Sequence, residues 1–169
     1  MTEPAVAAGW HTVPPQLNAC TTKKGPEVMR RFGSAAWSGS LRNGEGSVAT
    51  ESQALENYPY TFFSRYGEKP GTNPEEPLGA AHAACFTMSF ARMLGMGNFV
   101  PEQLASKSEV VIEKDGDGFS ITSVHLTVIA KIPGIDNTTF QSIATHAKAG
   151  CPASKLMNIE VGFEATLAS

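Results

Sequence analysis

The sequence lacks the features that mark a membrane or nucleic-acid-binding protein. No uninterrupted apolar run approaches the roughly 20 residues that span a bilayer. No basic block is present, and the net charge is -3. Apolar residues make up 41% and charged residues 17%, which is typical of a globular chain. We therefore expect neither a membrane nor a nucleic acid among its partners.

Targeting signals and cysteines are also scarce. Residues 1–15, MTEPAVAAGWHTVPP, have no basic start and no apolar core of the kind that directs secretion. We therefore place the protein in the cytoplasm. The chain has three cysteines. In that compartment they favour thiol chemistry, metal binding or inert thiols over a structural disulfide.

The chain is organised around residues 73–96, which predict one long helix. Asn73 is a suitable N-cap and Pro74 suits the first helical position. Because Pro77 cannot donate a main-chain hydrogen bond, the regular helix could also begin there, with Glu76 as its N-cap. The rest of the segment has no reliably polar face, which predicts a helix that is buried on all sides.

Three strands are expected before this helix, at residues 31–39, 46–51 and 58–66. Asn43-Gly44 predicts a hairpin between the first two. Pro59 indicates an edge strand or the start of a strand. On that strand Phe63 and Arg65 would share one face.

The segments after the helix alternate between strand and helix patterns. We expect a helical turn at 101–106, strands at 108–114 and 119–132, helices at 136–150 and 151–157, and a strand at 159–167. A change of apolar phase predicts a β-bulge near Thr122-Ser123. This order of strands and helices along the chain indicates an α+β fold with largely antiparallel sheets. We expect an extended arm at 1–28 and a single domain at 29–169.

Two cysteines stand in contexts that allow chemistry. Cys85 lies mid-helix in apolar company, where a purely structural thiol is the alternative. Cys151 precedes Pro152 at a helix start, where main-chain N–H groups favour a thiolate. A zinc module through His82, Cys85, His146 and Cys151 is a further alternative, although no C-x-x-C or H-x-x-x-H is present.

Three segments carry a family resemblance: SRYGEKPGTNPEE, NPEEPLGAAHAACF and AKAGCP. Together they resemble the osmotically inducible protein C family (OsmC), which belongs with the organic hydroperoxide resistance proteins (Ohr). The resemblance covers about residues 30–169, and GAAHAACF is similar to the OsmC branch. It implies a cofactor-independent peroxidase that acts on organic hydroperoxides in oxidative and osmotic stress defence. It also implies an intertwined homodimer whose sheets wrap two central helices.

The resemblance assigns roles to four residues. Cys85 is the peroxidatic cysteine, Cys151 the resolving cysteine, Arg65 the activating arginine and Glu75 the carboxylate that holds it. The chemistry explains the need for a cation, because burial raises a thiol pKa and a mid-helix thiol is far from the helix N-terminus. The sulfenic acid condenses with Cys151, and an external dithiol, lipoyl groups among the family's choices, reduces the disulfide.

Further expectations concern the surroundings of the thiol. Because it would share a strand face with Arg65, Phe63 is expected to line the substrate pocket. Glu75 and Cys85 are ten positions apart, about 15 Å on a straight helix, so we expect Glu75 to serve the partner subunit's thiol. Cys20 is expected to have no catalytic role. A binding protein in which Cys85 is only core packing is the alternative function.

Overall fold

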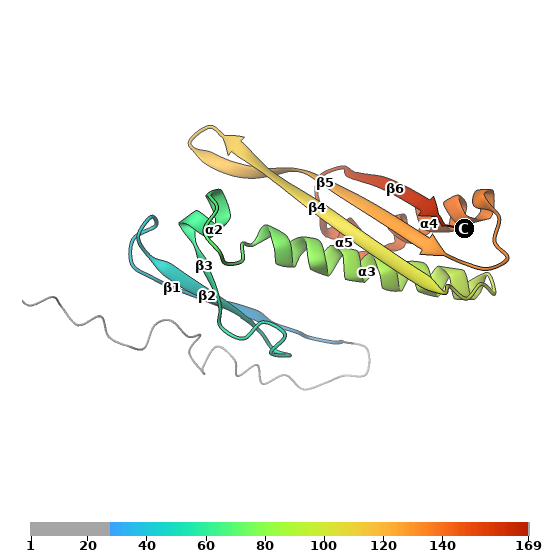
Figure 1. Cartoon of the computed structure of the whole chain (residues 1–169), viewed down its shortest axis with the longest axis horizontal. Coiled ribbons are helices and arrows are strands. Elements are labelled where there is room, and N and C mark those ends of the chain that lie inside the picture. The colour runs from blue at the N-terminus through green and yellow to red at the C-terminus, as the bar shows by residue number, and fades with distance from the viewer. Residues whose placement is uncertain (1–27, 169) are drawn as a thin grey trace, which may run out of the picture. The chain divides into compact units, whose positions relative to one another are not determined.

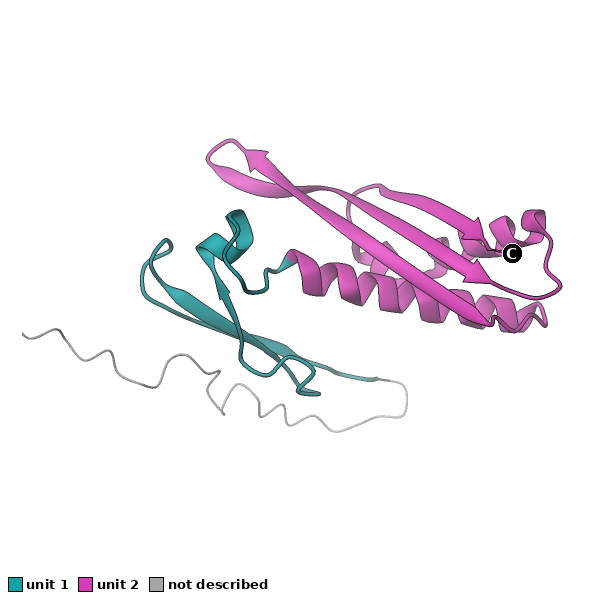
Figure 2. Cartoon of the chain, viewed as in Figure 1, with its two compact units in different colours: residues 1–74 teal, residues 75–169 magenta. Residues whose placement is uncertain are grey.

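The computed structural model describes residues 28–168. The chain divides into two compact units, residues 1–74 and 75–169 (Figure 2). The single domain predicted for residues 29–169 stays a prediction. The arm predicted for residues 1–28, and Cys20 within it, lie outside the described residues except for Val28.

Unit 1 contains a small antiparallel sheet in the order β1-β2-β3 (Figure 1). Its strands are β1 (Gly33–Ser38), β2 (Glu45–Thr50) and β3 (Tyr58–Thr61). The hairpin predicted between β1 and β2 is confirmed. A Cβ on Gly44 would lie 2.4 Å from the Ser38 carbonyl oxygen, so the turn requires glycine there. Pro59 lies on β3 at the end of the sheet, as predicted.

The strand predicted over residues 58–66 is wrong in its second half, because helix α2 (Phe62–Tyr66) replaces it. The Thr61 hydroxyl accepts from the Ser64 N–H at 3.0 Å, and the Ser64 hydroxyl accepts from the Thr61 N–H at 2.8 Å. This capping box starts a helix despite the alternating apolar pattern. Phe63 and Arg65 are therefore separated by about 200° around a helix, and the predicted shared face is wrong.

Unit 2 packs three helices with a second sheet (Figure 1). Its elements are α3 (Glu75–Met96), β4 (Gln103–Asp115), β5 (Gly118–Lys131), α4 (Asn137–Gly150), α5 (Pro152–Leu156) and β6 (Val161–Leu167). β4 and β5 are antiparallel, whereas β5 and β6 are parallel. The parallel pair follows from the crossover through α4 and α5. The α+β prediction is confirmed, with a mixed second sheet.

Two details of β4 and β5 test the sequence patterns. The helical turn predicted at residues 101–106 is wrong, because β4 already begins at Gln103 and its side chains alternate between exposed and half-buried. The predicted bulge is confirmed. Val111 pairs with Ser123 and Ile112 with Ile121, which leaves Thr122 as the extra residue.

Helix α3 begins at Glu75, one residue later than the start predicted at Pro74 with Asn73 as the cap, and the alternative start with Glu76 as the cap is wrong. Pro77 falls in the first turn, where its missing N–H costs no hydrogen bond within the helix. Asp136, the first residue of the range predicted for this helix, is the N-cap of α4 and accepts from the Thr139 N–H at 3.0 Å.

Only one side of α3 is buried. The buried side carries Gly79, His82, Phe86, Phe90 and Leu94. In contrast, Leu78, Met88 and Met96 are 36%, 76% and 68% exposed. The prediction of a helix buried on all sides is therefore wrong for a single chain, because the sheet and α4 cover only one face.

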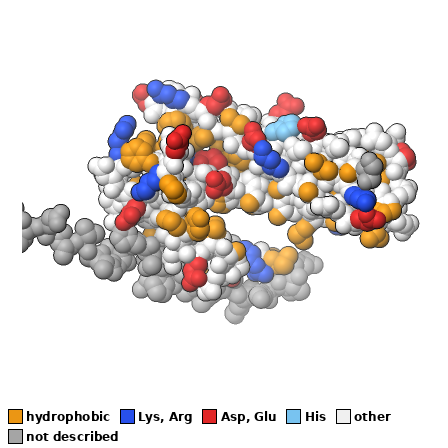
Figure 3. Space-filling model, viewed as in Figure 1, with side chains coloured by type: hydrophobic (Ala, Val, Ile, Leu, Met, Phe, Trp, Pro, Cys, Tyr) orange, Lys and Arg blue, Asp and Glu red, His pale blue; other side chains and the backbone are white. Residues whose placement is uncertain are grey.

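The described helices include none long and apolar enough to cross a membrane. On the face drawn in Figure 3, Lys and Arg lie among Asp and Glu, with apolar side chains exposed between them.

Candidate active site

Cys85 and Cys151 meet within unit 2. Cys85 lies midway along α3 and is half-buried, whereas Cys151 is the N-cap of α5 and is fully buried. Both are free thiols, and their side chains lie close enough to shift each other's pKa. The packing of α3 against α5 thus joins two residues that are 151 − 85 = 66 positions apart.

The surroundings separate the acidities of the two thiols. Burial raises the pKa of Cys85, and the bond with Cys151 raises it further, although the Ala153 N–H opposes both effects. Burial also opposes ionisation of Cys151, but hydrogen bonding from Ser154 and Cys85 outweighs it and lowers the pKa of Cys151. Cys151 is therefore the more acidic thiol of the pair.

Two groups of Ser154 act on the Cys151 sulfur, namely its main-chain N–H and its hydroxyl. The Cys151 side chain makes no capping hydrogen bond of regular geometry with the α5 main chain. The main-chain N–H therefore acts chiefly as a nearby dipole, which still favours negative charge on the sulfur.

His82, which the sequence offered as a metal ligand, is fully buried among hydroxyl groups. Its Nδ1 lies 2.8 Å from Oγ of Ser108, and its Nε2 lies 2.9 Å from Oγ of Ser154. Burial, followed by the charge of Lys148, lowers the pKa of His82. His82 is therefore neutral, and both of its ring nitrogens have partners.

The proposed zinc ligands do not assemble. His146 lies on α4 with Nδ1 2.7 Å from the Ser142 carbonyl oxygen. Across residues 28–168, no group of three His, Cys, Asp or Glu side chains is arranged to hold a metal ion. The geometry gives the zinc alternative no support.

Close helix–strand contact explains how His82 reaches its partner on β4. A Cβ built on Gly79 would lie 2.6 Å from the Ser108 carbonyl oxygen. Only glycine allows the α3 main chain to approach β4 this closely. Gly79 is three positions before His82, so the two share a helix face, and the same approach carries the imidazole to the Ser108 hydroxyl.

Of the other three predicted site residues, Arg65 and Phe63 belong to unit 1 and Glu75 to unit 2. Arg65 is on α2 in unit 1, with its guanidinium carbon 5.2 Å from the Tyr66 ring centroid. Phe63 is 46% exposed. It was predicted to lie beside Arg65 because both were expected on one strand face, but both lie on helix α2. Glu75 begins α3, ten positions and about 15 Å of helix from Cys85. The roles of all three residues stay predictions.

A sequence model of the OsmC-like protein family matches residues 67–165. The chain is 43% identical over 142 residues to a protein of Escherichia coli named "Peroxiredoxin OsmC", covering 84% of this chain and 99% of the relative. The chain belongs to the OsmC-like protein family. A Xanthomonas axonopodis "Organic hydroperoxide resistance protein" is 30% identical over 128 residues, which are 73% of this chain and 87% of that protein.

Solved structures agree on the fold of this OsmC-like protein. An organic hydroperoxide resistance protein from Elizabethkingia anophelis superposes with a TM-score of 0.65 at 21% identity, covering 85% of this chain and all of that one. The OhrB protein of Bacillus subtilis gives a TM-score of 0.60 at 22% identity, covering 80% and 98%. At this identity the likeness establishes the OsmC-like fold.

The predictions from the sequence did not include Ser154 and Ser108, the two serines that hydrogen-bond to His82 near the thiols. A signal for Ser154 was present, because it lies three positions after the cap residue Cys151, where the third N–H of a helix faces the cap. No comparable signal marked Ser108, since it becomes a partner only through the pairing of β4 with α3.

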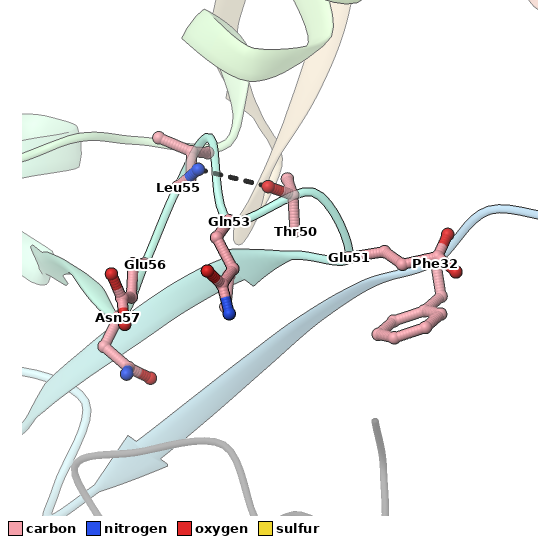
Figure 4. Close-up of a pocket in the computed structure, with 8 residues that line it drawn as sticks. Phe32, Thr50, Glu51, Gln53, Leu55, Glu56 and Asn57 are labelled. Atoms are coloured by element: carbon pink, nitrogen blue, oxygen red, sulfur yellow. Dashed lines mark hydrogen bonds between the residues drawn. The ribbon is translucent and has the colours of Figure 1, made fainter. Parts of the chain in front are cut away.

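Unit 1 of this OsmC-like protein has a hollow of its own, of about 360 Å³, along the connection between β2 and β3 (Figure 4). Its lining residues are Phe32, Ala49, Thr50, Glu51, Gln53, Leu55, Glu56 and Asn57. They include no thiol, imidazole or cation. The hollow therefore offers no group for the thiol chemistry.

Proposed function

We propose that this OsmC-like protein is a thiol peroxidase that reduces organic hydroperoxides to alcohols in oxidative and osmotic stress defence. In this proposal Cys85 attacks the peroxide and Cys151 resolves the product. The main support for this proposal is the closeness of the two thiols within unit 2, where each shifts the pKa of the other. Membership of the family, and the names of the relatives at 43% and 30% identity, point to the same activity.

The reaction begins when the Cys85 thiol loses its proton. The Cys85 thiolate then attacks one peroxide oxygen, the O–O bond breaks, and the alkoxide leaves and takes a proton to become the alcohol. Cys85 is now a sulfenic acid. Cys151 loses its proton, its thiolate attacks the sulfenic sulfur, an S–S bond forms, the S–O bond breaks, and the hydroxide leaves and takes a proton to become water. No cofactor is needed.

A cation is needed to hold the Cys85 thiolate long enough to react. Burial and the neighbouring thiol both raise the pKa of Cys85, so unit 2 by itself disfavours this thiolate. We assign this task to Arg65, whose guanidinium can hydrogen-bond both the thiolate and the departing alkoxide. Glu75 would fix the guanidinium through two parallel hydrogen bonds.

A homodimer accounts for two features of α3. One is the exposed apolar side chains Leu78, Met88 and Met96, which a second copy would bury. The other is the separation of about 15 Å between Glu75 and Cys85 on one helix. Two α3 helices packed antiparallel across a two-fold axis would bring Glu75 of one subunit toward Cys85 of the other.

The remaining partner is the reductant. The disulfide must be opened by thiol exchange, and a dithiol does so in one encounter because its second sulfur displaces the mixed disulfide. We propose a dithiol reductant of the lipoyl type, in the cytoplasm.

The test combines stoichiometry with turnover. Free thiols are counted before and after one equivalent of tert-butyl hydroperoxide, and the enzyme should lose two. Turnover is then measured with the bulky hydroperoxide and with hydrogen peroxide, using a dithiol and then a monothiol. We expect faster turnover with the organic hydroperoxide than with hydrogen peroxide, and faster turnover with the dithiol than with the monothiol. An unchanged thiol count would leave Cys85 as core packing in a non-catalytic binding protein.

A further inference from the structure

His82 is a buried imidazole that the proposed reaction does not use. It is fully buried, and its two ring nitrogens lie 2.8 Å from the Ser108 hydroxyl and 2.9 Å from the Ser154 hydroxyl. Ser154 is the third residue of α5, whose N-cap is Cys151, and its hydroxyl lowers the pKa of the Cys151 thiol. Ser154 thus lies between a histidine and the sulfur to which we assign the resolving role.

We propose that His82 and Ser154 are positioning residues for Cys151. Ser108 donates to Nδ1 of His82, the Nε2–H of His82 donates to the Ser154 oxygen, and Ser154 directs its own proton at the Cys151 sulfur. This inference rests on the proposed peroxidase function and identifies the residues that govern its disulfide-forming step.

The direction of these bonds follows from the charges. A neutral imidazole has one donor and one acceptor, so His82 either donates to Ser154 or accepts from it. If His82 accepted, Ser154 would donate its proton to a neutral nitrogen. Hydrogen bonds to a charged acceptor are roughly twice as strong, so the proton of Ser154 goes to Cys151 when that thiol ionises. His82 must then carry its proton on Nε2.

The titratable groups around Cys151 and His82 come from two helices. Cys85 on α3 donates to Cys151, and Lys148 on α4 lowers the pKa of His82 by its charge. Lys148 also donates to the Val161 carbonyl oxygen, which ties it to β6. A neutral His82 and a negative Cys151 are the charge states that both neighbours favour.

These hydrogen bonds would affect the second half of the reaction, in which the disulfide forms. The Cys151 thiolate gives an electron pair to the sulfur of the Cys85 sulfenic acid, the S–S bond forms, and hydroxide leaves and is protonated to water. A larger thiolate fraction speeds this attack at neutral pH, because nucleophilicity falls by less than the thiolate fraction rises. Faster resolution leaves less time for a second peroxide to produce sulfinic acid.

Four variants of the full chain separate positioning from general packing. His82→Gln keeps an N–H at the position of Nε2, whereas His82→Asn keeps a polar group only at the position of Nδ1. Ser154→Ala removes the hydroxyl. Ser106→Ala is the matched control, because Ser106 accepts a hydrogen bond of 2.9 Å from Thr87 on α3 but has no place in this chain of bonds.

The first readout is the ultraviolet absorbance of the thiolate as a function of pH. Each variant is made in a Cys20→Ser, Cys85→Ser background, so that Cys151 is the single thiol. The midpoint should rise by about one pH unit in Ser154→Ala and His82→Asn, and stay in place in His82→Gln and Ser106→Ala. Equal midpoints in all four variants would overturn the proposal.

The second readout is intact mass after treatment with tert-butyl hydroperoxide, with all three cysteines present. Ser154→Ala and His82→Asn should raise the ratio of sulfinic acid to disulfide by about fivefold or more, with His82→Gln close to the parent protein. An equal rise in Ser106→Ala would mean loosened packing and would overturn the proposal. If the parent protein consumes no peroxide, the peroxidase function fails, while the absorbance titration still decides whether His82 and Ser154 position Cys151.

Discussion

Cys85 on α3 and Cys151 at the start of α5 lie close enough to shift each other's pKa: burial and the neighbouring Cys151 raise the pKa of Cys85, whereas Cys85 helps Ser154 to lower the pKa of Cys151. Cys151, to which we assign the resolving role, is therefore the more acidic thiol of the reduced pair. Attack on a peroxide requires the thiolate of the less acidic cysteine, Cys85. Whatever stabilises the Cys85 thiolate must come from outside this pair.

Replacing each cysteine in turn should separate the two half-reactions. Cys85→Ser should abolish peroxide consumption, because the attacking sulfur is gone. Cys151→Ser should give one rapid turnover and then over-oxidation of Cys85, because the sulfenic acid has no partner. Stopped-flow kinetics and intact mass measure both. Normal cycling of Cys151→Ser without an added monothiol would refute the resolving role, and Cys20→Ser serves as the control that should change nothing.

The stability of the reduced protein should pass through a maximum near the ordinary thiol pKa of about 8.5. Cys151 has a depressed pKa, so its contribution is present above that value and is lost as the pH falls through the folded-state pKa. Cys85 has a raised pKa, so its contribution is present below that value and is lost as the pH rises through the folded-state pKa. Urea unfolding from pH 6 to 10 measures this. A Cys85→Ser, Cys151→Ser double variant should lose the maximum, and an identical profile in that variant would contradict the assignment.

Arg65→Ala should slow attack on the peroxide by about 10²- to 10³-fold, which is the usual cost of removing a donor to a developing anion. Arg65→Lys should recover only part of the loss, because an ammonium cannot reproduce the planar fork. Single-turnover kinetics in excess peroxide, with thermal unfolding as the check on folding, provide the measurement. A rate within a factor of two of the parent enzyme would remove Arg65 from the mechanism.

Glu75 provides the test of a composite site. Cys85→Ser and Glu75→Ala proteins, each inactive alone, are mixed under conditions that exchange subunits. If Glu75 serves the partner subunit's thiol, each heterodimer contains one intact site, and activity should return. Verified exchange without recovery would instead place the function of Glu75 within its own subunit.

Gly79→Ala should destabilise the protein by about 1–3 kcal/mol, because the new methyl group would meet the Ser108 carbonyl oxygen at 2.6 Å and push α3 from β4. Gly95→Ala on the same helix is the matched control. No atom outside its immediate helix neighbourhood lies within 4 Å of a Cβ built there, so alanine should stabilise by about 0.5–1 kcal/mol. Chemical denaturation compares the two variants. Equal effects would show that the close approach at Gly79 is unimportant.

Local patterns in the sequence determined much of this fold. The Asp136 cap, the bulge at Thr122, the edge position of Pro59 and the cap role of Cys151 each depend on a few neighbouring residues, and the structure has all four. The pattern failed where two local signals competed. At Thr61–Ser64 the capping box outweighed an alternation of apolar residues that favoured a strand.

The tertiary structure decided what the cysteines touch. The sequence could place Cys85 on a helix and Cys151 at a helix start, but their contact depends on how α3 packs against α5. The partners of His82 likewise come from β4 and α5, 26 and 72 positions away. No local pattern encodes such distances, because the energy that selects them is the burial of Phe86, Phe90 and the rest of the unit 2 core.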